Sequence, residues 1–154
     1  MTIKERLTSI RDARMWEDKI PFHYEYTAGV AGESFLRGLI DGKILGARCE
    51  SCGITYLPPK MYCTNCFREI ASFRDLGLKG RIAAFTEAYI DFAGGRVEKP
   101  YLLAFVTFAD AKGGLIQRVT GRKPRIGSRV VARFKPRKSR TGAISDILSF
   151  VVES

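Results

Sequence analysis

The sequence predicts a mainly β protein with a helical N-terminus, in which a zinc ribbon precedes a five-stranded closed barrel. Three observations lead to this prediction. The 154 residues are 45% apolar and 27% charged, which is the composition of a folded globular chain. All four cysteines lie within residues 49–66, in two C-x-x-C pairs. After them come β-like segments linked by turns. We therefore expect N-terminal helices over residues 1–42, the ribbon over 43–72 and the barrel over 73–154.

Two amphipathic helices are expected before the ribbon. Thr2 and Glu5 have the spacing of a capping box, which predicts a first helix through about Glu17. A second helix is expected over about residues 30–41, and Gly42 should end it. Its apolar stripe consists of Phe35, Leu36, Leu39 and Ile40. Two interpretations stay open: the helices cover the core of their own chain, or one of them docks on another protein.

The cysteine segment predicts a tetrahedral metal site of the kind that zinc prefers. Its ligands are Cys49, Cys52, Cys63 and Cys66. Short strands are expected around the first pair, over 43–49 and 53–59. Gly53 suits the left-handed backbone of the first turn, and Asn65 is the residue of the second turn that best tolerates it. Iron in the same sulfur cage is the alternative metal. Four protein ligands leave no position for an activated water, so the site should be structural.

Five further segments are expected to form strands. They are residues 80–91, 101–109, 114–120, 129–135 and 144–152. Residues 110–114, "DAKGG", predict a hairpin between the second and the third. Five short strands without long helices between them favour a closed barrel, because closure removes exposed sheet edges. The run "YLLAFV", 101–106, is apolar at both parities, so both of its faces should be covered.

The basic surplus of the chain comes from one segment. The net charge is +10, and residues 111–145 contain eleven basic and no acidic residues. Such a field attracts phosphates or acidic proteins, but it does not choose among partners. In the strand over 129–135, Arg129 and Arg133 should share one face, because they alternate with Val130 and Ala132.

No catalytic set is recognisable in the sequence. The cysteines are all assigned to the metal, and there is no G-x-S-x-G elbow, P-loop or dinucleotide motif. The single histidine, His23, lies among aromatic residues and is expected to be packed or at the surface rather than a general base. We therefore do not expect independent catalysis. The longest apolar run has six residues, so neither a signal peptide nor a membrane span is expected, and the protein should be cytoplasmic.

Most of the chain, about residues 24–152, resembles a known family. The similar segments are "RCESCGITYLPPKMYCTNC", "GRIAAFT", "PYLLAFVTF" and "GSRVVARF". That family consists of small archaeal and bacterial proteins, long known as a domain of unknown function, that join a rubredoxin-like zinc ribbon to an OB-fold. Its members accompany thiolases and other acyl-CoA enzymes. The resemblance implies an OB-fold barrel and a non-catalytic accessory subunit that binds a thiolase-like enzyme and helps to form a CoA or acyl-CoA site.

Basic residues are the candidates for binding CoA phosphates or an acidic partner. They are Lys60, Arg122, Lys123, Arg125, Lys135, Arg137, Lys138 and Arg140. The family often has arginine at the position of Lys60, and lysine keeps the charge but lacks the bidentate fork. A solvated basic surface without a ligand is a second interpretation. The third is a different function, a single-stranded nucleic-acid-binding OB-fold protein with a zinc ribbon. Its candidate stacking platforms are Phe85, Tyr89, Phe105 and Phe108, for which core packing is the competing explanation.

Overall fold

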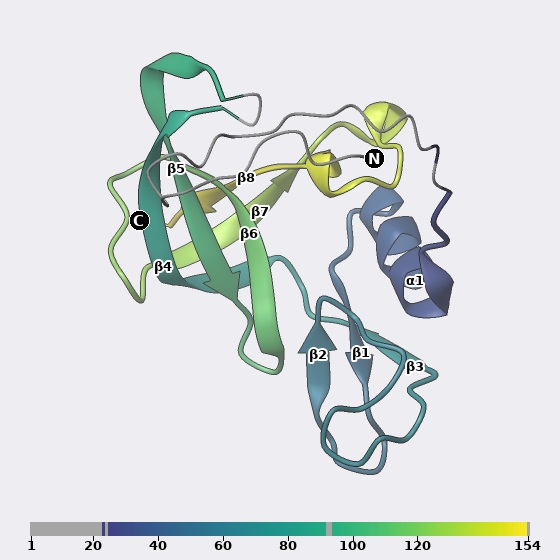
Figure 1. Ribbon diagram of the computed structural model, residues 1–154. Helices are drawn as coiled ribbons and strands as arrows, with labels where there is room; N and C mark the ends of the chain where they lie inside the picture. The colour runs from purple at the N-terminus through teal and green to yellow at the C-terminus, as the bar shows by residue number, and fades with distance from the viewer. Residues whose placement is uncertain (1–22, 24, 92–93, 154) are drawn as a thin grey trace, which may run out of the picture.

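The computed structural model describes residues 23, 25–91 and 94–153. The elements are, in chain order, α1 (Gly29–Ile40), β1 (Leu45–Arg48), β2 (Thr55–Leu57), β3 (Ser72–Asp75), β4 (Lys79–Ile90), β5 (Arg96–Thr107), β6 (Lys112–Thr120), β7 (Arg129–Phe134) and β8 (Ile147–Val152). The small sheet of β1–β3 lies at one end of the barrel, and α1 lies beside it (Figure 1). The helix expected through Glu17 lies outside the described residues. Within those residues, no helix is both long and apolar enough to cross a membrane.

One face of α1 packs against the barrel. Phe35 and Leu39 are buried, with 8% and 0% exposure, and belong to the same core as the barrel residues. Gly42 has a φ of +74°, and its N–H donates to the Leu39 carbonyl, which ends the helix as expected. Ile40, the last residue of the predicted stripe, is 39% exposed and lies against the loop at Gly142 instead of the core. For α1, the interpretation that the helix covers its own chain is therefore confirmed.

The five predicted barrel strands are present and form a closed sheet. β4, β5 and β6 make an antiparallel meander, β7 pairs with β4 and β8, and a parallel pairing of β6 with β8 closes the barrel. This five-stranded closure is an OB-fold. The interior includes Ile82, Val106, Leu115, Val119, Val130, Ile147 and Phe150. The last strand begins at Ile147 rather than at residue 144, because a short 3-10 turn, Ile144–Asp146, precedes it.

The two faces of β5 are covered to different extents. Ala104 and Val106 point into the core, with 2% and 0% exposure. Leu103 and Phe105 lie on the outer face and are only half-buried. The expectation that both faces are covered is therefore met on the inner face and only partly on the outer one.

The ribbon sheet continues into the barrel. β1 pairs with β2 and with β3, a strand that the sequence did not predict and that crosses the expected domain limit at residue 72. β2 runs parallel to the start of β6, with Tyr56 opposite Lys112 and Leu57 opposite Gly113. Gly113 has a φ of +93°, and a Cβ at this position would overlap the Leu57 carbonyl. All eight strands consequently form one connected sheet, while the domain limits themselves stay predictions.

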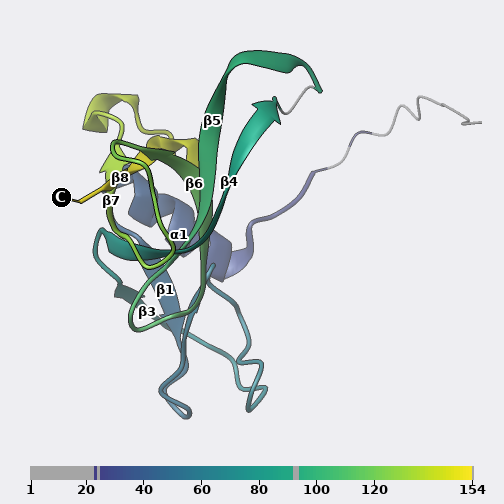
Figure 2. The ribbon, with the colours of Figure 1, turned by 90° about the vertical axis from the view of Figure 1, so that its left-hand side faces the viewer.

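Two hairpins shape the surface of the barrel. The one between β5 and β6 is as predicted, but its turn is formed by residues 108–111, where the Ala111 N–H donates to the Phe108 carbonyl. Both glycines of "DAKGG" lie inside β6. Glycine is required there because a Cβ would overlap the Leu57 carbonyl at the first position and the Val106 carbonyl at the second. The far halves of β4 and β5 project beyond the barrel as a two-stranded arm (Figure 2).

Candidate functional site

The fold brings all four cysteines of the ribbon into one cluster. Cys49 directly follows β1, Cys52 lies in the same turn, and Cys63 and Cys66 come from the facing turn. Their four Sγ atoms lie within 4.8 Å of one another. The Cys49 and Cys66 sulfurs are 3.6 Å apart, and a tetrahedral ion with metal–sulfur bonds of about 2.3 Å requires a separation of about 3.8 Å. The cluster therefore has the donor set and the dimensions of a four-sulfur metal site.

The two cysteine turns share one backbone pattern. In the first, the Gly53 N–H donates to the Cys49 carbonyl at 2.8 Å, and Gly53 has a φ of +67°. In the second, the Phe67 N–H donates to the Cys63 carbonyl at 2.9 Å, and Phe67 has a φ of +57°. The expectation that Asn65 tolerates the left-handed conformation of this turn is wrong, because the matching hydrogen bond places that conformation directly after Cys66. A phenylalanine at positive φ is strained, and its side chain is 80% exposed.

Hydrogen bonds from neighbouring side chains reach the sulfurs. The Tyr56 hydroxyl, on a side chain with 3% exposure, lies 3.3 Å from Cys63 Sγ and accepts a hydrogen bond from the Thr64 hydroxyl. The Asn65 N–H donates to Cys63 Sγ, and the Asn65 side-chain amide donates to Cys52 Sγ at 3.3 Å. Asn65 thus serves the ligands through donors rather than through its backbone conformation. Sequence reasoning missed Tyr56, because a tyrosine in a short strand gives no signal of a contact with a sulfur.

These donors favour the thiolate form of Cys63. The hydrogen bond with Tyr56 is the largest influence, and it lowers the pKa of Cys63 to about 6 against the opposing effect of burial. The same hydrogen bond raises the pKa of Tyr56, so the phenol keeps its proton and donates it to sulfur. A thiolate is the form that binds a metal ion. The surroundings of Cys63 are therefore prepared for metal binding.

The eight basic residues predicted to bind a ligand fall into two groups according to their contacts. Four of them contact the protein itself: Lys60, Lys135, Arg137 and Arg140. The Lys60 ammonium lies 5.3 Å from the centre of the Tyr56 ring, and Arg137 approaches the Asp41 carboxylate at 3.7 Å. The other four have exposed side chains that make no hydrogen bond or ion pair with any described residue: Arg122, Lys123, Arg125 and Lys138.

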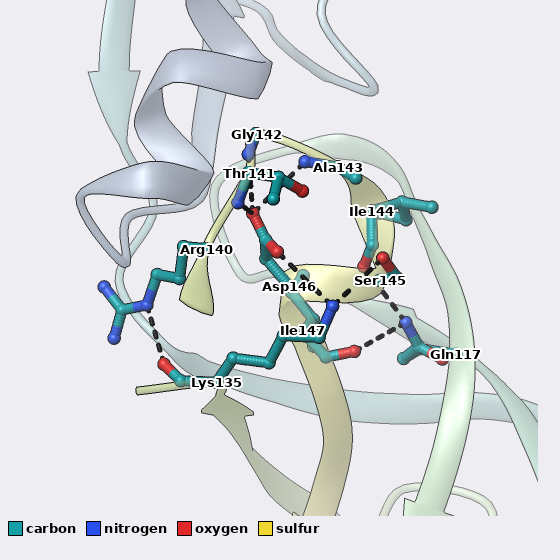
Figure 3. A network of polar contacts seen from close by, with 10 residues as sticks. All are labelled: Gln117, Lys135, Arg140, Thr141, Gly142, Ala143, Ile144, Ser145, Asp146 and Ile147. Carbon is teal, nitrogen blue, oxygen red and sulfur yellow. Dashed lines mark hydrogen bonds and ion pairs between the residues drawn. The ribbon is translucent and has the colours of Figure 1, made fainter. Parts of the chain in front are cut away.

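Lys135 and Arg140 belong to a structural network around Asp146 (Figure 3). One carboxylate oxygen of Asp146 accepts hydrogen bonds from the N–H groups of Thr141, Gly142 and Ala143, at 2.7 to 3.1 Å. The Lys135 ammonium lies 3.6 Å from the other oxygen. Burial acts to raise the pKa of Asp146, but the three N–H donors and the Lys135 charge outweigh it, so the pKa lies below its ordinary value.

Arg140 fastens the same loop to α1. Its guanidinium donates to the Lys135 carbonyl at 2.8 Å and to the Ile40 carbonyl at 3.1 Å, and lies over the Phe134 ring. These contacts explain part of the basic run in residues 135–140 as internal structure. Lys138 is the cation of this run whose side chain makes no hydrogen bond or ion pair with a described residue.

The aromatic candidates do not form one stacking platform. Phe108 is 3% exposed and makes an edge contact with Phe150 inside the barrel, so core packing is the correct explanation for it. Phe105 lies on the outer face of β5, and Phe85 of β4, which is 37% exposed, lines the same shallow pocket. Two rings therefore lie near each other, and the other two candidates lie elsewhere. Tyr89 lies in the projecting arm of β4. Aligned bases would need several rings on one face.

One part of the outer surface of the barrel is apolar. This outer apolar face consists of Leu103, Phe105, Ile116, Ile144 and Leu148. Ile116 is 69% exposed, and Ile144 and Leu148 are each 45% exposed. Part of the face is a shallow groove of about 460 Å³ between β6 and the end of the loop before β8. The sequence signal for this face is the apolar run of β5 at both parities.

The remaining sequence candidate, His23, is exposed. In the described part of the chain, the cysteine cluster is the one group of histidine, cysteine or acidic side chains arranged to hold a metal ion. The alternation predicted for β7 is present, with Val130 and Ala132 buried and Arg129 and Arg133 exposed.

Comparisons with known proteins agree with this architecture. Residues 38–70 match the ChsH2 rubredoxin-like zinc ribbon domain, and residues 73–135 match the ChsH2 C-terminal OB-fold domain. A DUF35 domain-containing scaffold protein of Methanocaldococcus jannaschii is 30% identical over 101 residues, which is 60% of this chain and 67% of the relative.

Two solved structures are similar in fold. A DUF35-family protein of unknown function from Sulfolobus solfataricus has 27% identity and a TM-score of 0.65, over 84% of this chain and 90% of that one. The Ltp2–ChsH2(DUF35) aldolase has 18% identity and a TM-score of 0.56, over 70% of this chain and 85% of that one. With its four-cysteine ribbon and OB-fold barrel matched in order, the chain belongs to the ChsH2/DUF35 family.

Proposed function

We propose that the chain is a non-catalytic accessory subunit that binds a thiolase-like or other acyl-CoA enzyme and helps to form its CoA or acyl-CoA site. The observation that carries this proposal is the outer apolar face of the barrel. Contiguous exposed apolar residues are a feature of protein interaction sites. Leu103, Phe105 and Ile116 of this face lie on β5 and β6, the strands with which OB-folds bind their ligands.

The occupant of the outer apolar face is, in this proposal, the partner enzyme. The relative from Methanocaldococcus jannaschii is a scaffold protein, and the Ltp2–ChsH2(DUF35) aldolase contains Ltp2 together with a ChsH2 DUF35 chain. Both names support an assembly in which a chain of this fold stands next to another protein. Four of the five residues of the face are aliphatic and one, Phe105, is aromatic. This composition favours a protein over a nucleic acid, which would stack its bases on several aromatic rings.

The cations without an internal partner would contribute to the ligand site. Arg122, Lys123, Arg125 and Lys138 are free to approach the phosphates of CoA bound at the interface, because no described side chain pairs with them. Lys60, Lys135, Arg137 and Arg140 would have to give up contacts that they already make.

The metal in this proposal is zinc, held by Cys49, Cys52, Cys63 and Cys66. A bound zinc ion supplies folding free energy to a ribbon that is too small to bury a core of its own. Tyr56 and Asn65 hold the sulfurs in position, and the four ligands leave no position for substrate. Elemental analysis of protein purified without added metal should find one zinc per chain; one iron per chain would contradict the assignment.

The experiment that tests the function is affinity purification of the tagged chain from native extract, with mass spectrometry of the bound proteins. We expect an acyl-CoA enzyme at constant stoichiometry. Ile116→Glu should abolish its recovery, whereas Ile126→Glu should not, because Ile126 is similarly exposed at 74% but lies outside the outer apolar face. Recovery of no acyl-CoA enzyme, or equal loss with both variants, would contradict the proposal, as would retention of single-stranded nucleic acid alone.

A further inference from the structure

A second feature of the barrel is a groove that shares no lining residue with the outer apolar face. Its volume is about 570 Å³, and it lies between the start of β4, the turn after β5 and the start of β7. The charged residues that line it are Lys79, Arg81, Arg129 and Glu153, and its apolar wall includes Ala109 and Ala111. This basic groove contains none of the eight residues that the sequence pointed to. Two of its cations, Lys79 and Arg81, lie outside the basic segment.

Two arginines face each other across the strands of the basic groove. Arg81 of β4 and Arg129 of β7 are direct partners in the antiparallel pairing, so their side chains leave the sheet on the same face. Like charges directly opposite each other destabilise a sheet. Neither guanidinium forms an ion pair with a carboxylate in the described part of the chain, although one N–H group of Arg81 donates to the Gly127 carbonyl at 3.2 Å. A bound anion could offset the repulsion between these two guanidinium groups, as ligands often do for unfavourable local arrangements at binding sites.

The charge of the basic groove matches a dianion. Glu153 lies 3.7 Å from the Lys79 ammonium, so it offsets that cation and leaves the charges of Arg81 and Arg129. A phosphate monoester carries about two negative charges at neutral pH. Guanidinium groups bind phosphate through two parallel hydrogen bonds, which a pair of neighbouring arginines can supply together.

The size of the groove indicates more than a free phosphate ion. A volume of about 570 Å³ is within the range of small-molecule sites, roughly 300–1,000 Å³. Ala109 and Ala111, which are exposed and half-buried respectively, give the organic part of a ligand an apolar surface. We propose that the basic groove binds the phosphate monoester of a small organic molecule, with Arg81 and Arg129 as the phosphate ligands. This inference goes beyond the proposed function, because it requires no partner enzyme.

The test uses the metal-loaded full-length chain and three probes: AMP, adenosine and inorganic phosphate. Binding is followed by amide chemical shifts in NMR spectra. We expect AMP to shift the amides of Gly80, Arg81, Thr107 and Arg129 in a saturable way, and adenosine, which lacks the phosphate, to shift none of them. Inorganic phosphate should bind the same residues more weakly. Phosphate that binds as tightly as AMP would overturn the assignment of an organic ligand.

Matched variants separate a built site from general attraction. Arg129→Gln should weaken AMP binding by at least about tenfold, as expected when a charge-assisted hydrogen bond is lost. Arg133→Gln should leave it within about twofold, because Arg133 lies on the same face of β7 but outside the groove. Without ligand, Arg129→Gln should melt no lower than the wild type, since it removes the repulsion from Arg81. Equal loss in the two variants, a lower melting temperature for Arg129→Gln, or no shift at Gly80 would overturn the proposal. Partner capture through Ile116 is independent of each of these results.

Discussion

Tyr56 connects the packing of the ribbon to its metal ligands. The tyrosine side chain is buried among ribbon residues, and its hydroxyl donates to Cys63 Sγ. Groups that hydrogen-bond to metal ligands orient them and adjust their charge. A residue that sequence reasoning treated as an ordinary strand position therefore takes part in the metal site.

Tyr56→Phe should weaken metal binding without unfolding the ribbon, because the ring stays and only the donor to Cys63 is lost. The expected loss of zinc affinity is about 10- to 100-fold, measured by competition with a chromophoric chelator. Tyr62→Phe is the control, since Tyr62 is 56% exposed and, within the described part of the chain, is not among the residues that hydrogen-bond to a sulfur. Identical affinities for the two variants would show that the Tyr56 hydroxyl does not support the ligands.

The loop before β8 depends on the negative charge of Asp146. Its side chain is fully buried and accepts three backbone hydrogen bonds. Asp146→Asn should lower the free energy of unfolding at pH 7 by about 2–4 kcal/mol, because buried donors lose a charged acceptor. Urea denaturation measures this loss. Asp110→Asn is the matched control and should cost less than about 1 kcal/mol, because the Asp110 pair with Arg74 is exposed.

The same carboxylate gives stability a definite dependence on pH. The pKa of Asp146 in the folded protein is lower than its ordinary value. The stabilisation is therefore complete above the unfolded pKa of about 4 and disappears as the pH falls through the lower folded value. The difference in unfolding free energy between the wild type and Asp146→Asn should shrink between about pH 5 and pH 2. A difference that stays constant over this range would show that the carboxylate charge is not what the loop depends on.

At the scale of elements, the parallel pairing of β2 with β6 joins the ribbon to the barrel. Gly113→Ala should disrupt this pairing, because its Cβ would meet the Leu57 carbonyl and its φ is positive. Gly127→Ala is the control: its φ of +87° gives similar backbone strain, but no atom lies within 4 Å of its Cβ. We expect Gly113→Ala to cost about 1–3 kcal/mol more than the control. Faster amide exchange at residues 55–57 in Gly113→Ala alone would locate the effect, and equal exchange in both variants would contradict it.

The sequence predicted the elements that depend on local pattern and missed those that depend on tertiary contact. The α1 stripe, the five barrel strands and the four cysteines follow from periodicity and spacing, which are properties of neighbouring residues. The sequence of β3 has no strong strand pattern, and this segment becomes a strand through its pairing with β1. The 3-10 turn before β8 exists because Asp146 collects the N–H groups of the loop, which no pattern in "GAISD" reveals. Arg81 and Arg129 meet only through the pairing of β4 with β7.

At the scale of the whole molecule, the cysteine cluster lies in a ribbon core that is distinct from the barrel core. The ribbon core contains Ala47, Cys49, Tyr56, Cys63 and Ile70, and the metal site is part of it. The barrel core receives Phe35 and Leu39 from α1. The loss of the metal should therefore act first on the ribbon.

Removal of the metal with a chelator should unfold the ribbon and leave the barrel folded with a lowered melting temperature. The ribbon depends on metal binding for its folding free energy, whereas the barrel is held by its own apolar core. Hydrogen exchange should show loss of protection over β1–β3 and retained protection over β4–β8. Cys52→Ser should have the same effect. Complete loss of protection in β5 and β8 would show that the barrel does not stay folded without the metal-bound ribbon.

Ile44 and Leu57 belong to the ribbon region by their place in the chain, yet their side chains, with 0% and 2% exposure, lie in the interior of the barrel. A chimaera that takes its ribbon from a relative would therefore also replace part of the barrel core. Such a chimaera should fold only if Ile44 and Leu57 fit the recipient barrel and Gly113 still accommodates the Leu57 carbonyl. We therefore expect these three positions to vary together among natural variants.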